Sequence, residues 1–345
     1  MSLTRTVGRS LLASAVSIAL TVPFTVSAEG VVNVYSARQE GLIKPLLDEF
    51  SAETGIQVQL VTASAPELLQ RLRLEGRRSP ADVLITVDAG NLNEAAEAGI
   101  FRATESAVLT ENVPSAYRDA EGEWFGLSLR ARPIMVAKDR VTEDALETYD
   151  DLTDEQWRGK ICVRSSSNVY NQSMLAAMIS RHGSEAAEAW ARGIVANMAR
   201  PPQGGDRDQI MAVADGACDI AIANTYYLGG MLAGSDESQR AGAEKIHVIF
   251  PNQDSTGTHV NVSGAGVLKH APNPENAVKL LEFLVSQTAQ TWYAEANQEY
   301  PVRPDVEPSN ILRGFGEFKM DDLPLDELGV HQAEALRIFD RVGWR

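Results

Sequence analysis

The N-terminal third of the chain alternates between two kinds of segment, and this alternation limits the folds open to it. Residues 31–35, 56–61 and 81–86 are short runs rich in Val, Ile and Leu. Between these runs, leucines recur at helical spacing in residues 42–50 and 65–76. Helices that connect successive strands let the strands pair in parallel and cover the faces of the sheet. The alternation therefore predicts an α/β fold, with a mostly parallel sheet and flanking helices.

The length of the chain indicates more than one such unit. Its 345 residues exceed the ~250–300 at which a single hydrophobic core stops growing. The extended run at 125–137 is long enough for a strand that leaves one lobe and enters another, and 259–267 suits the return crossing. Further strand patterns lie at 161–163, 219–224 and 245–250. We therefore expect a second α/β lobe, joined to the first by crossing hinge strands.

These crossings divide the chain between the two lobes. We expect residues 29–128 and 253–305 to form the N-terminal lobe, with the helical pattern at 274–286 packed back on it. Residues 129–252 and 306–345 then form the C-terminal lobe, the last part of which is a helical tail.

The first 28 residues are typical of a secretory signal peptide. Arg5 and Arg9 precede an apolar stretch at 11–26, and a small-residue cleavage site ends at Ala28. The stretch has 16 residues, fewer than the ~20 that span a bilayer. We expect cleavage after Ala28 and export to the periplasm, and an uncleaved membrane anchor is the alternative.

The charge of the chain argues against a nucleic-acid partner. The formal net charge is −16, and removal of the signal peptide, which holds two arginines and no acids, takes it to −18. Phosphate backbones are bound through clustered Lys and Arg. No such basic stripe is present in the sequence, so we expect no binding to nucleic acid.

The sequence contains two cysteines, Cys162 and Cys218, which are candidates for a disulfide. An exported protein meets an oxidising environment, where a pair of cysteines usually forms a disulfide. We therefore predict a disulfide between them, and two separate buried thiols are the alternative.

Established catalytic motifs are absent from the sequence. It contains no Gly-x-Ser-x-Gly nucleophile elbow, no His-Glu-x-x-His zinc motif and no Gly-x-x-x-x-Gly-Lys phosphate loop. An exported enzyme on an α/β fold is the least favoured alternative, and we expect a binding protein instead of an enzyme.

Three tyrosines follow two of the predicted strands. Tyr226 and Tyr227 come after the strand pattern at 219–223, and Tyr170 comes after the one at 161–163. Ligands of open α/β sheets bind beyond the carboxyl ends of the strands. Ionised phenol oxygen is a hard, anionic donor, so three phenolates would balance the charge of a ferric ion. The alternative is that the tyrosines only pack, with their hydroxyls in water.

Four further side chains are candidates for an anion site. Arg130 and Arg132 lie on the same face of the predicted crossing strand because side chains alternate along a strand. Ser36 and Arg38 lie at the start of the first helical pattern, where free backbone N–H groups favour anions. A surface salt bridge and an ordinary helix cap are the respective alternatives.

Several segments together resemble one known family. The most specific are Val-Tyr-Ser-Ala-Arg at 34–38, Ser-Pro-Ala-Asp-Val-Leu at 79–84, the stretches at 159–168 and 199–206, and Asn-Thr-Tyr-Tyr at 224–227. With them the chain resembles the periplasmic ferric-iron-binding proteins of ABC-type iron importers, especially the Fut type. The similarity covers nearly the whole mature chain. It implies the type II fold of periplasmic binding proteins, in which two α/β lobes enclose a cleft.

The resemblance also implies a function. Members of this family hold ferric iron in the cleft through tyrosinates, at positions that match Tyr170, Tyr226 and Tyr227. A family arginine beside the metal matches Arg130. We therefore expect a monomeric periplasmic protein that delivers Fe(3+), or a ferric chelate, to an inner-membrane ABC permease. A binding protein for an organic or oxyanion ligand, such as a phosphonate or carboxylate, is the alternative on the same fold.

One departure from the family leaves part of the coordination open. Where many relatives carry His-Tyr after the Ser-x-Arg turn, this chain has Gln39 and Glu40. Either Glu40 ligates iron through its carboxylate, or the first lobe supplies no direct ligand. Three tyrosinates fill half of an octahedral shell, so we expect carbonate, citrate or water to complete it, held by Arg38, Arg130 or helix N-termini. Ser36 and Gln39 are further candidates to contact this anion, and the preferred oxidation state of the iron stays open.

Overall fold

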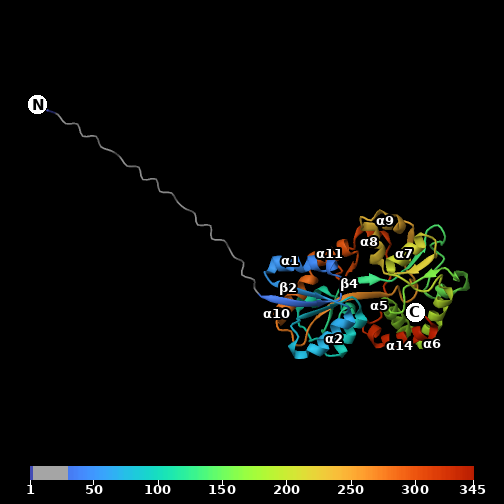
Figure 1. The fold of residues 1–345 in the computed structure, drawn as a ribbon, viewed down its shortest axis with the longest axis horizontal. Coiled ribbons are helices and arrows are strands. Elements are labelled where there is room, and N and C mark those ends of the chain that lie inside the picture. Colours follow the sequence, from blue (N-terminus) through green and yellow to red (C-terminus); the bar gives the residue numbers. More distant parts are fainter. Residues whose placement is uncertain (3–29) are drawn as a thin grey trace.

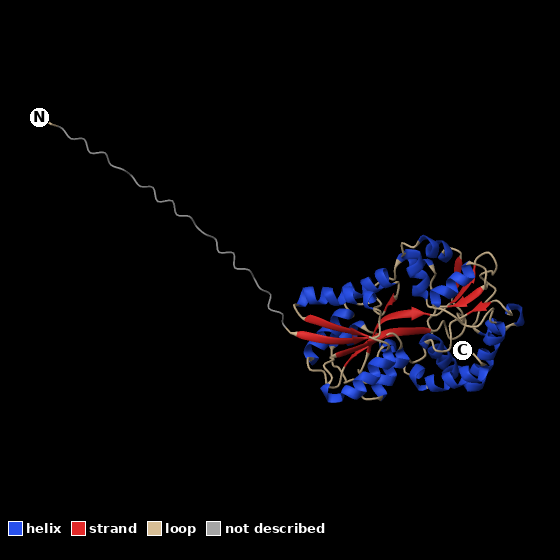
Figure 2. Ribbon diagram, in the orientation of Figure 1, coloured by secondary structure: helices blue, strands red, loops and turns tan. Residues whose placement is uncertain are grey.

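Two separate β-sheets divide the molecule into two lobes (Figures 1 and 2). The structure is a computed structural model that describes residues 1–2 and 30–345. The predicted cleavage site after Ala28 and all but the first two residues of the predicted signal peptide therefore lie outside the described residues. Within the described ranges, no helix has the length and apolar character needed to cross a membrane.

The first sheet has the strand order β10-β4-β9-β3-β1-β2. Four of its strands share one direction, and β9 and β10 run against them. Every residue of β3 is buried, as its apolar sequence predicts for a strand covered by helices on both faces. The strands are β1 (Val31–Ser36), β2 (Gln57–Thr62), β3 (Val83–Thr86), β4 (Phe125–Ala131), β9 (Val260–Val267) and β10 (Tyr300–Pro301).

The second sheet has the order β6-β7-β5-β8. Here β6, β7 and β8 share one direction, and β5 runs against them. The predicted α/β class with two lobes is therefore confirmed. The sheets are mixed instead of mostly parallel, because β9, β10 and β5 run against their neighbours and make five of the eight strand pairs antiparallel. The strands are β5 (Ile134–Ala137), β6 (Ile161–Cys162), β7 (Ile220–Ile222) and β8 (Ile246–Ile249).

The chain crosses twice between the sheets. β4 stays in the first sheet through Ala131, and β5 begins in the second sheet at Ile134. The single extended run expected over 125–137 is thus two strands, separated at Arg132 and Pro133. Proline has no N–H to donate to a ladder, which suits a break between sheets. The return crossing leads from β8 into β9.

Helices cover both sheets. The first lobe contains α1 (Lys44–Thr54), α2 (Ala65–Glu75), α3 (Ala89–Glu97), α4 (Ala107–Asn112), α10 (Pro274–Leu284) and α11 (Gln287–Asn297). The second lobe contains α5 (Val169–His182), α6 (Ser184–Asn197), α7 (Asp206–Ala214), α8 (Thr225–Ala233) and α9 (Glu237–Ala243). As expected from the sequence, α10 packs on β1 and β9 of the first lobe.

The C-terminal tail spans both lobes. It forms α12 (Asn310–Gly314), α13 (Glu327–Val330) and α14 (Gln332–Val342). α13 packs against α3 of the first lobe and α5 of the second, while α14 packs on α5 and α6. The expectation of a helical tail is wrong for residues 315–326, which contain no helix. Gly316 adopts a left-handed conformation with φ of 98°, and Pro324 removes a donor, so both oppose a continuous helix.

A disulfide ties the neighbouring parallel strands β6 and β7 together, as the sequence predicted. Cys162 ends β6, and Cys218 lies just before β7. The bridge is buried and closes a loop with a sequence separation of 56 residues. It fixes the strand pair that leads into α5 and α8.

We expect replacement of Cys162 and Cys218 by serine to lower the free energy of unfolding by about 4 kcal/mol, because a loop of this length regains its freedom in the unfolded chain. Chemical denaturation at constant pH measures the change. Replacement of both cysteines by alanine serves as the control for buried hydroxyls and should give a similar loss. A loss below about 1 kcal/mol in both variants would contradict a stabilising cross-link.

Candidate metal centre

The structure brings the three predicted tyrosines together. Tyr170 lies in the first turn of α5, and Tyr226 and Tyr227 lie in the first turn of α8. The Tyr226 hydroxyl donates a hydrogen bond of 3.2 Å to the Tyr170 hydroxyl. The ring centroids of Tyr226 and Tyr227 are 4.2 Å apart. Phenol oxygens from two helices therefore converge on one region.

This convergence follows from the sheet. β6 and β7 are parallel neighbours, so the segments after them emerge at the same edge. α5 begins directly after Asn168, whose side chain accepts a hydrogen bond from the Asn171 N–H and caps the helix. α8 begins directly after Asn224. Helix N-termini favour negative charge, so both helix starts suit a phenolate or a bound anion.

The phenols of Tyr226 and Tyr227 are protonated at neutral pH in the metal-free protein. Burial raises the pKa of Tyr226 well above its ordinary value, and the neighbouring oxygens of Tyr170 and Tyr227 raise it further. Burial also raises the pKa of Tyr227, to which the carboxylate of Asp206 contributes. A cation that binds here as a phenolate complex must therefore displace protons.

Arg130 lies beside the phenols from the first lobe. Its guanidinium carbon is 5.5 Å from the ring centroid of Tyr226 and 5.8 Å from that of Tyr170. The side chain is 2% exposed, and it donates hydrogen bonds to the Val87 carbonyl and to Ser263. Burial disfavours its charge, but Glu299 and the phenol oxygens outweigh this and raise its pKa. Arg130 is thus a fixed positive charge against the tyrosine cluster.

A buried carboxylate holds two arginines in place. Glu299 accepts two hydrogen bonds of 3.0 Å from Arg38 and one of 3.4 Å from Arg130. Burial would raise the pKa of Glu299, but the charges of Arg38 and Arg130 outweigh it and hold the pKa below its ordinary value. Arg38 also donates to Ser263, and its own N–H donates to the Ser36 hydroxyl at 3.1 Å. Arg38 and Ser36 are therefore engaged within the first lobe.

A second ion network lies under the phenols in the second lobe. Asp206 is buried, and its carboxylate pairs with Arg164 at 2.7 Å and with Arg132 at 3.5 Å. Arg132 also donates to Asn224, directly before α8, at 3.0 Å. Arg130 and Arg132, which were expected on one face of a strand, therefore pair with carboxylates of different lobes. The change of sheet at Arg132 is the reason.

Sequence reasoning missed these partners. The sequence does not predict Glu299, Asp206 and Arg164 as charged groups of the site. Each lies more than 30 residues from its partner in the chain, and no local pattern marks such a pair. Such a pair is recognised only when the fold shows that both charged side chains are buried next to each other.

Gln39 and Glu40 have a different environment. Both side chains are exposed, and Glu40 begins a short 3-10 helix at Glu40–Leu42. In the described part of the chain, neither side chain forms an ion pair or a hydrogen bond. The structure shows no hydrogen bond or ion pair between these side chains and the three tyrosines.

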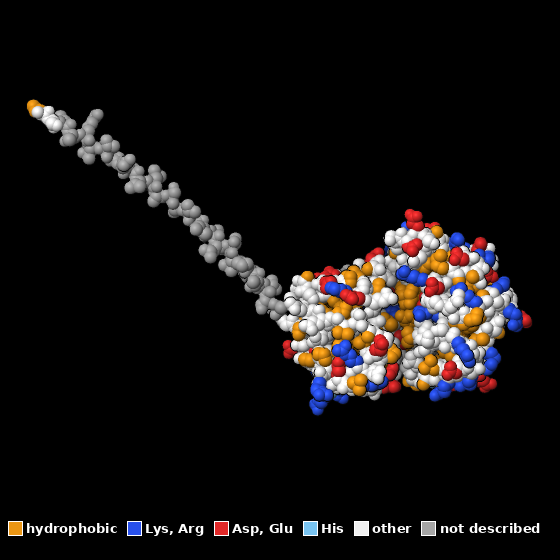
Figure 3. All heavy atoms as spheres, viewed as in Figure 1, with side chains coloured by type: hydrophobic (Ala, Val, Ile, Leu, Met, Phe, Trp, Pro, Cys, Tyr) orange, Lys and Arg blue, Asp and Glu red, His pale blue; other side chains and the backbone are white. Residues whose placement is uncertain are grey.

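The donor set suits a hard, highly charged cation. Among the described residues, no group of three or more His, Cys, Asp and Glu side chains is arranged to hold a metal ion. The tyrosines are therefore the candidate ligands. On the face shown in Figure 3, a groove separates the two halves of the molecule, with hydrophobic and basic side chains along it.

Comparison with known proteins identifies the family of the chain. Residues 46–313 match the family model of bacterial extracellular solute-binding proteins. The chain belongs to this family. The solute-binding protein is 49% identical to iron uptake protein A1 of Synechocystis sp., over 91% of this chain and 87% of that protein. It is 28% identical to the major ferric iron-binding protein of Neisseria meningitidis serogroup B, over 91% of this chain and 93% of that protein.

Solved structures show the same relationship. The Trichodesmium protein IdiA (FutA), solved in complex with iron and citrate, is 47% identical and has a TM-score of 0.87, over 92% of this chain and all of that one. The ferric binding protein of Campylobacter jejuni is 38% identical with a TM-score of 0.88, over 91% of this chain and all of that one. The resemblance to Fut-type iron-binding proteins and the type II fold are confirmed.

The buried network generates a pH prediction for this solute-binding protein. We expect Glu299→Gln to lower the free energy of unfolding at pH 7 by about 3–5 kcal/mol, because two buried arginines lose their counter-charge. The folded-state pKa of Glu299 lies below its ordinary value of 4.5, so its contribution is complete above that pH and is lost as the pH falls through the folded-state pKa.

Denaturation at a series of pH values measures both effects. The variant should lose less stability than the wild type as the pH falls below 4.5. Glu295→Gln, an exposed position nearby in the chain, is the matched control and should behave like the wild type. Equal acid sensitivity of wild type and Glu299→Gln would refute the role of this carboxylate.

Proposed function

We propose that this solute-binding protein captures ferric iron between its lobes and delivers it to an inner-membrane ABC permease. The observation that carries the proposal is the meeting of Tyr170, Tyr226 and Tyr227 beside Arg130. Its relatives are solute-binding proteins of iron uptake and transport, which favours cargo binding over catalysis. Iron is thus cargo, bound and released unchanged.

The proposed iron site uses three phenolates and an exogenous anion. Three phenolates neutralise the charge of Fe(3+), and a small anion such as citrate or carbonate, or water, fills the remaining positions. Arg130 and the N-termini of α5 and α8 provide the positive potential for that anion. Arg38 is already paired with Glu299, so we assign it to holding Arg130 in place. Citrate accompanies iron in the related Trichodesmium structure.

A contact between the lobes lies one helical turn from this site. The Asp88 carboxylate, which caps α3 of the first lobe, accepts a hydrogen bond of 2.8 Å from the Ser173 hydroxyl of α5. It also accepts one of 2.8 Å from the Asn261 side chain on β9. Ser173 lies one turn after Tyr170, so the helix that supplies an iron ligand also bridges the lobes. Such contacts are what a closed, loaded form would gain over an open one.

The cellular setting is part of the proposal. We propose a monomer in the periplasm, exported by a signal peptide cleaved after Ala28. Membership of an extracellular solute-binding family supports this location. The proposed lobes are residues 29–128 with 253–305 and 129–252 with 306–345. The membership of the strands in two sheets supports this division, with β4 extending the first lobe to Ala131.

We expect ferric citrate to give the purified protein a red-orange tyrosinate-to-iron charge-transfer colour. Tyr226→Phe and Tyr227→Phe should each abolish or strongly weaken it, because each removes an anionic ligand. Tyr117→Phe is the matched control, since this tyrosine belongs to the first lobe and contacts Met320. Absence of colour in the wild type, with an unchanged melting temperature, would overturn the iron proposal and return attention to an organic anion.

Iron binding should also release protons. Because burial raises the pKa values of Tyr226 and Tyr227, each ligating phenol gives up one proton on binding. The affinity for iron should therefore fall as the pH is lowered from 8 to 5. Calorimetry in buffers of different ionisation enthalpy counts the protons, and binding without proton release would contradict phenolate ligation.

The exogenous anion generates a separate prediction. We expect Glu40→Gln to leave iron affinity within about threefold of the wild type, or less than 1 kcal/mol, because this exposed carboxylate is not needed in the shell. Omission of citrate and carbonate should weaken binding far more. Titration of iron in the presence and absence of each anion measures both effects. A loss of the colour in Glu40→Gln would instead assign the carboxylate as a ligand.

A further inference from the structure

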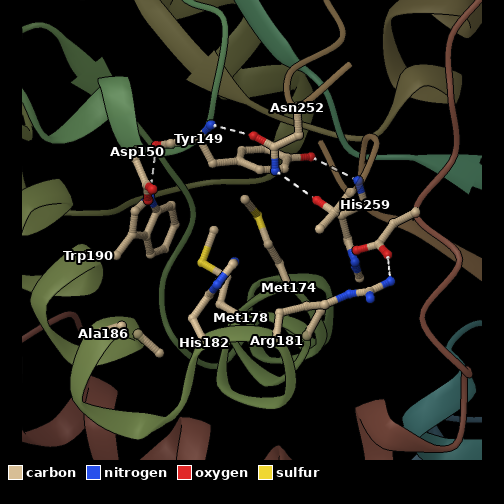
Figure 4. A pocket seen from close by; sticks show the side chains of 14 residues that line it. Tyr149, Asp150, Met174, Met178, Arg181, His182, Ala186, Trp190, Asn252 and His259 are labelled. Carbon is tan, nitrogen blue, oxygen red and sulfur yellow. Dashed lines mark hydrogen bonds and ion pairs between the residues drawn. The ribbon is translucent and has the colours of Figure 1, made fainter. Parts of the chain in front are cut away.

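A cavity of about 200 Å³ lies beside the hinge (Figure 4). Its walls come from α5 and α6 of the second lobe, from the return crossing at residues 252–259 and from the C-terminal tail at Asp321. The tyrosines assigned to iron and the arginines beside them are not among the residues that line it. The cavity therefore lies outside the proposed iron site, and its own lining indicates what it can hold.

One part of the wall is apolar. Met174 and Ala177 of α5 and Trp190 of α6 are buried, and the half-buried Met178 lies one turn after Met174. Figure 4 shows the two methionine side chains between Trp190 and His259. Methionine side chains are flexible and make favourable contacts with aromatic rings. This part of the wall therefore suits an apolar surface, and in particular an aromatic one.

The imidazole of His259 lines the same cavity and has no partner in the described part of the chain. The residue is 5% exposed, and its ring forms neither a hydrogen bond nor an ion pair with any described residue. Its backbone is engaged, because the N–H donates to the Tyr149 hydroxyl at 3.2 Å and the carbonyl accepts from the Arg132 N–H at 3.0 Å. Buried polar groups nearly always have a hydrogen-bond partner, and a ligand in the cavity would supply the missing one.

The protonation state of His259 defines that partner. Burial and the nearby charge of Arg132 lower the pKa of His259 to about 3. The ring is therefore neutral at neutral pH, with one nitrogen that donates a hydrogen bond and one that accepts. Such a ring suits a hydroxyl group, which also both donates and accepts.

The other buried polar groups of the wall are already engaged. The Trp190 indole N–H donates to the Tyr149 carbonyl at 2.8 Å, and the Tyr149 hydroxyl donates to a backbone carbonyl at 2.8 Å. The side chain of the half-buried Asn252 accepts from the Tyr149 N–H at 3.2 Å and donates to Thr256 at 3.3 Å. Among the buried residues described in the wall, His259 is thus the one whose side-chain polar atoms are left free.

The charges of the wall do not favour an anion. Arg181 pairs with the carboxylates of Asp321 and Asp322, so its charge is already balanced. Asp150 adds an exposed carboxylate to the wall. A charged ligand of either sign would also lose its hydration against the apolar side chains. The lining therefore suits a neutral molecule.

The volume of the cavity limits the size of that molecule. A cavity of about 150 Å³ lined by apolar side chains holds benzene. The cavity of about 200 Å³ beside the hinge therefore has room for one aromatic ring with a short substituent.

We propose that this cavity binds one small, neutral, single-ring aromatic molecule with a hydroxyl group. Its ring packs against Met174, Met178 and Trp190, and its hydroxyl bonds to the imidazole of His259. The ligand contacts both α5, which carries Tyr170 in its first turn, and the return crossing between the lobes. This is a second binding function of the chain, and it does not depend on iron.

Phenol and toluene are the probes, because toluene has the ring and the size of phenol without its hydroxyl. We expect the iron-free protein, labelled with ¹³C-methyl methionine, to bind one equivalent of phenol with NMR shifts at Met174 and Met178. Met198, a half-buried methionine outside the cavity, is the internal control. Toluene should bind at least about tenfold more weakly, which corresponds to ~1.4 kcal/mol.

Two variants test the contacts, and a cooperative melting transition checks that each is folded. His259→Phe keeps a ring and removes both nitrogens, so the preference for phenol over toluene should fall below about threefold. A change that only disturbs the packing would weaken both probes alike. Ala177→Leu fills the cavity and should weaken both probes at least about tenfold. Ala189→Leu, an exposed position on α6 outside the cavity, is the matched control.

Tyr226→Phe separates this cavity from the tyrosine cluster, and it should bind phenol as the wild type does. The site would be overturned if the wild type did not bind phenol, if the methyl signals of Met174 and Met178 did not shift, or if Ala177→Leu bound both probes normally. Equal binding of phenol and toluene by the wild type would overturn the role of His259. Because every titration uses iron-free protein, failure here leaves the iron proposal untouched.

Discussion

The buried carboxylate of Glu299 is the interaction on which the rest of the cleft depends. Two guanidinium groups, those of Arg38 and Arg130, are almost fully buried beside it. An unpaired charge at this depth would cost several kcal/mol, so the three groups are stable only as a set. The set ties the start of the first helix to β4 and to the residue before β10. Arg130 is thereby held against the phenol rings before any ligand arrives.

This fixed charge does not ionise the phenols by itself. Burial raises the pKa values of Tyr226 and Tyr227 by more than the neighbouring arginines lower them. Tyr226 and Tyr227 are therefore hydroxyls in the free protein, and they would become anions when a cation provides enough charge to displace their protons. The attraction between a phenolate and a trivalent ion is stronger than that between a phenolate and a divalent ion, so a trivalent ion offsets more of the free energy needed to remove the protons. At the proposed iron site, this proton displacement would favour Fe(3+) over Fe(2+).

The sequence was sufficient for the features that depend on order along the chain. Alternating strands and helices predicted the sheets, and two strand ends placed Tyr170 and Tyr226 at one edge. It was not sufficient for pairs that are distant in sequence, such as Glu299 with Arg38 or Asp206 with Arg164, because no periodicity records which charges are buried together. The prediction of a helix at residues 315–326 is wrong for a local reason. Their glycine and proline override the expectation of a helical tail.

The helices that carry the proposed iron ligands also contact the other lobe. Gly229 of α8 lies so close to the first lobe that a Cβ atom there would be 2.8 Å from the Cβ of Gln298. Gln298 itself adopts a left-handed conformation with φ of 56° and directly precedes Glu299. A side chain at Gly229 would push α8 away from the residue that anchors Arg38 and Arg130. The proposed iron ligands on α8 and the arginines held by Glu299 therefore share one interlobe contact, which would couple the position of the lobes to the occupancy of the site.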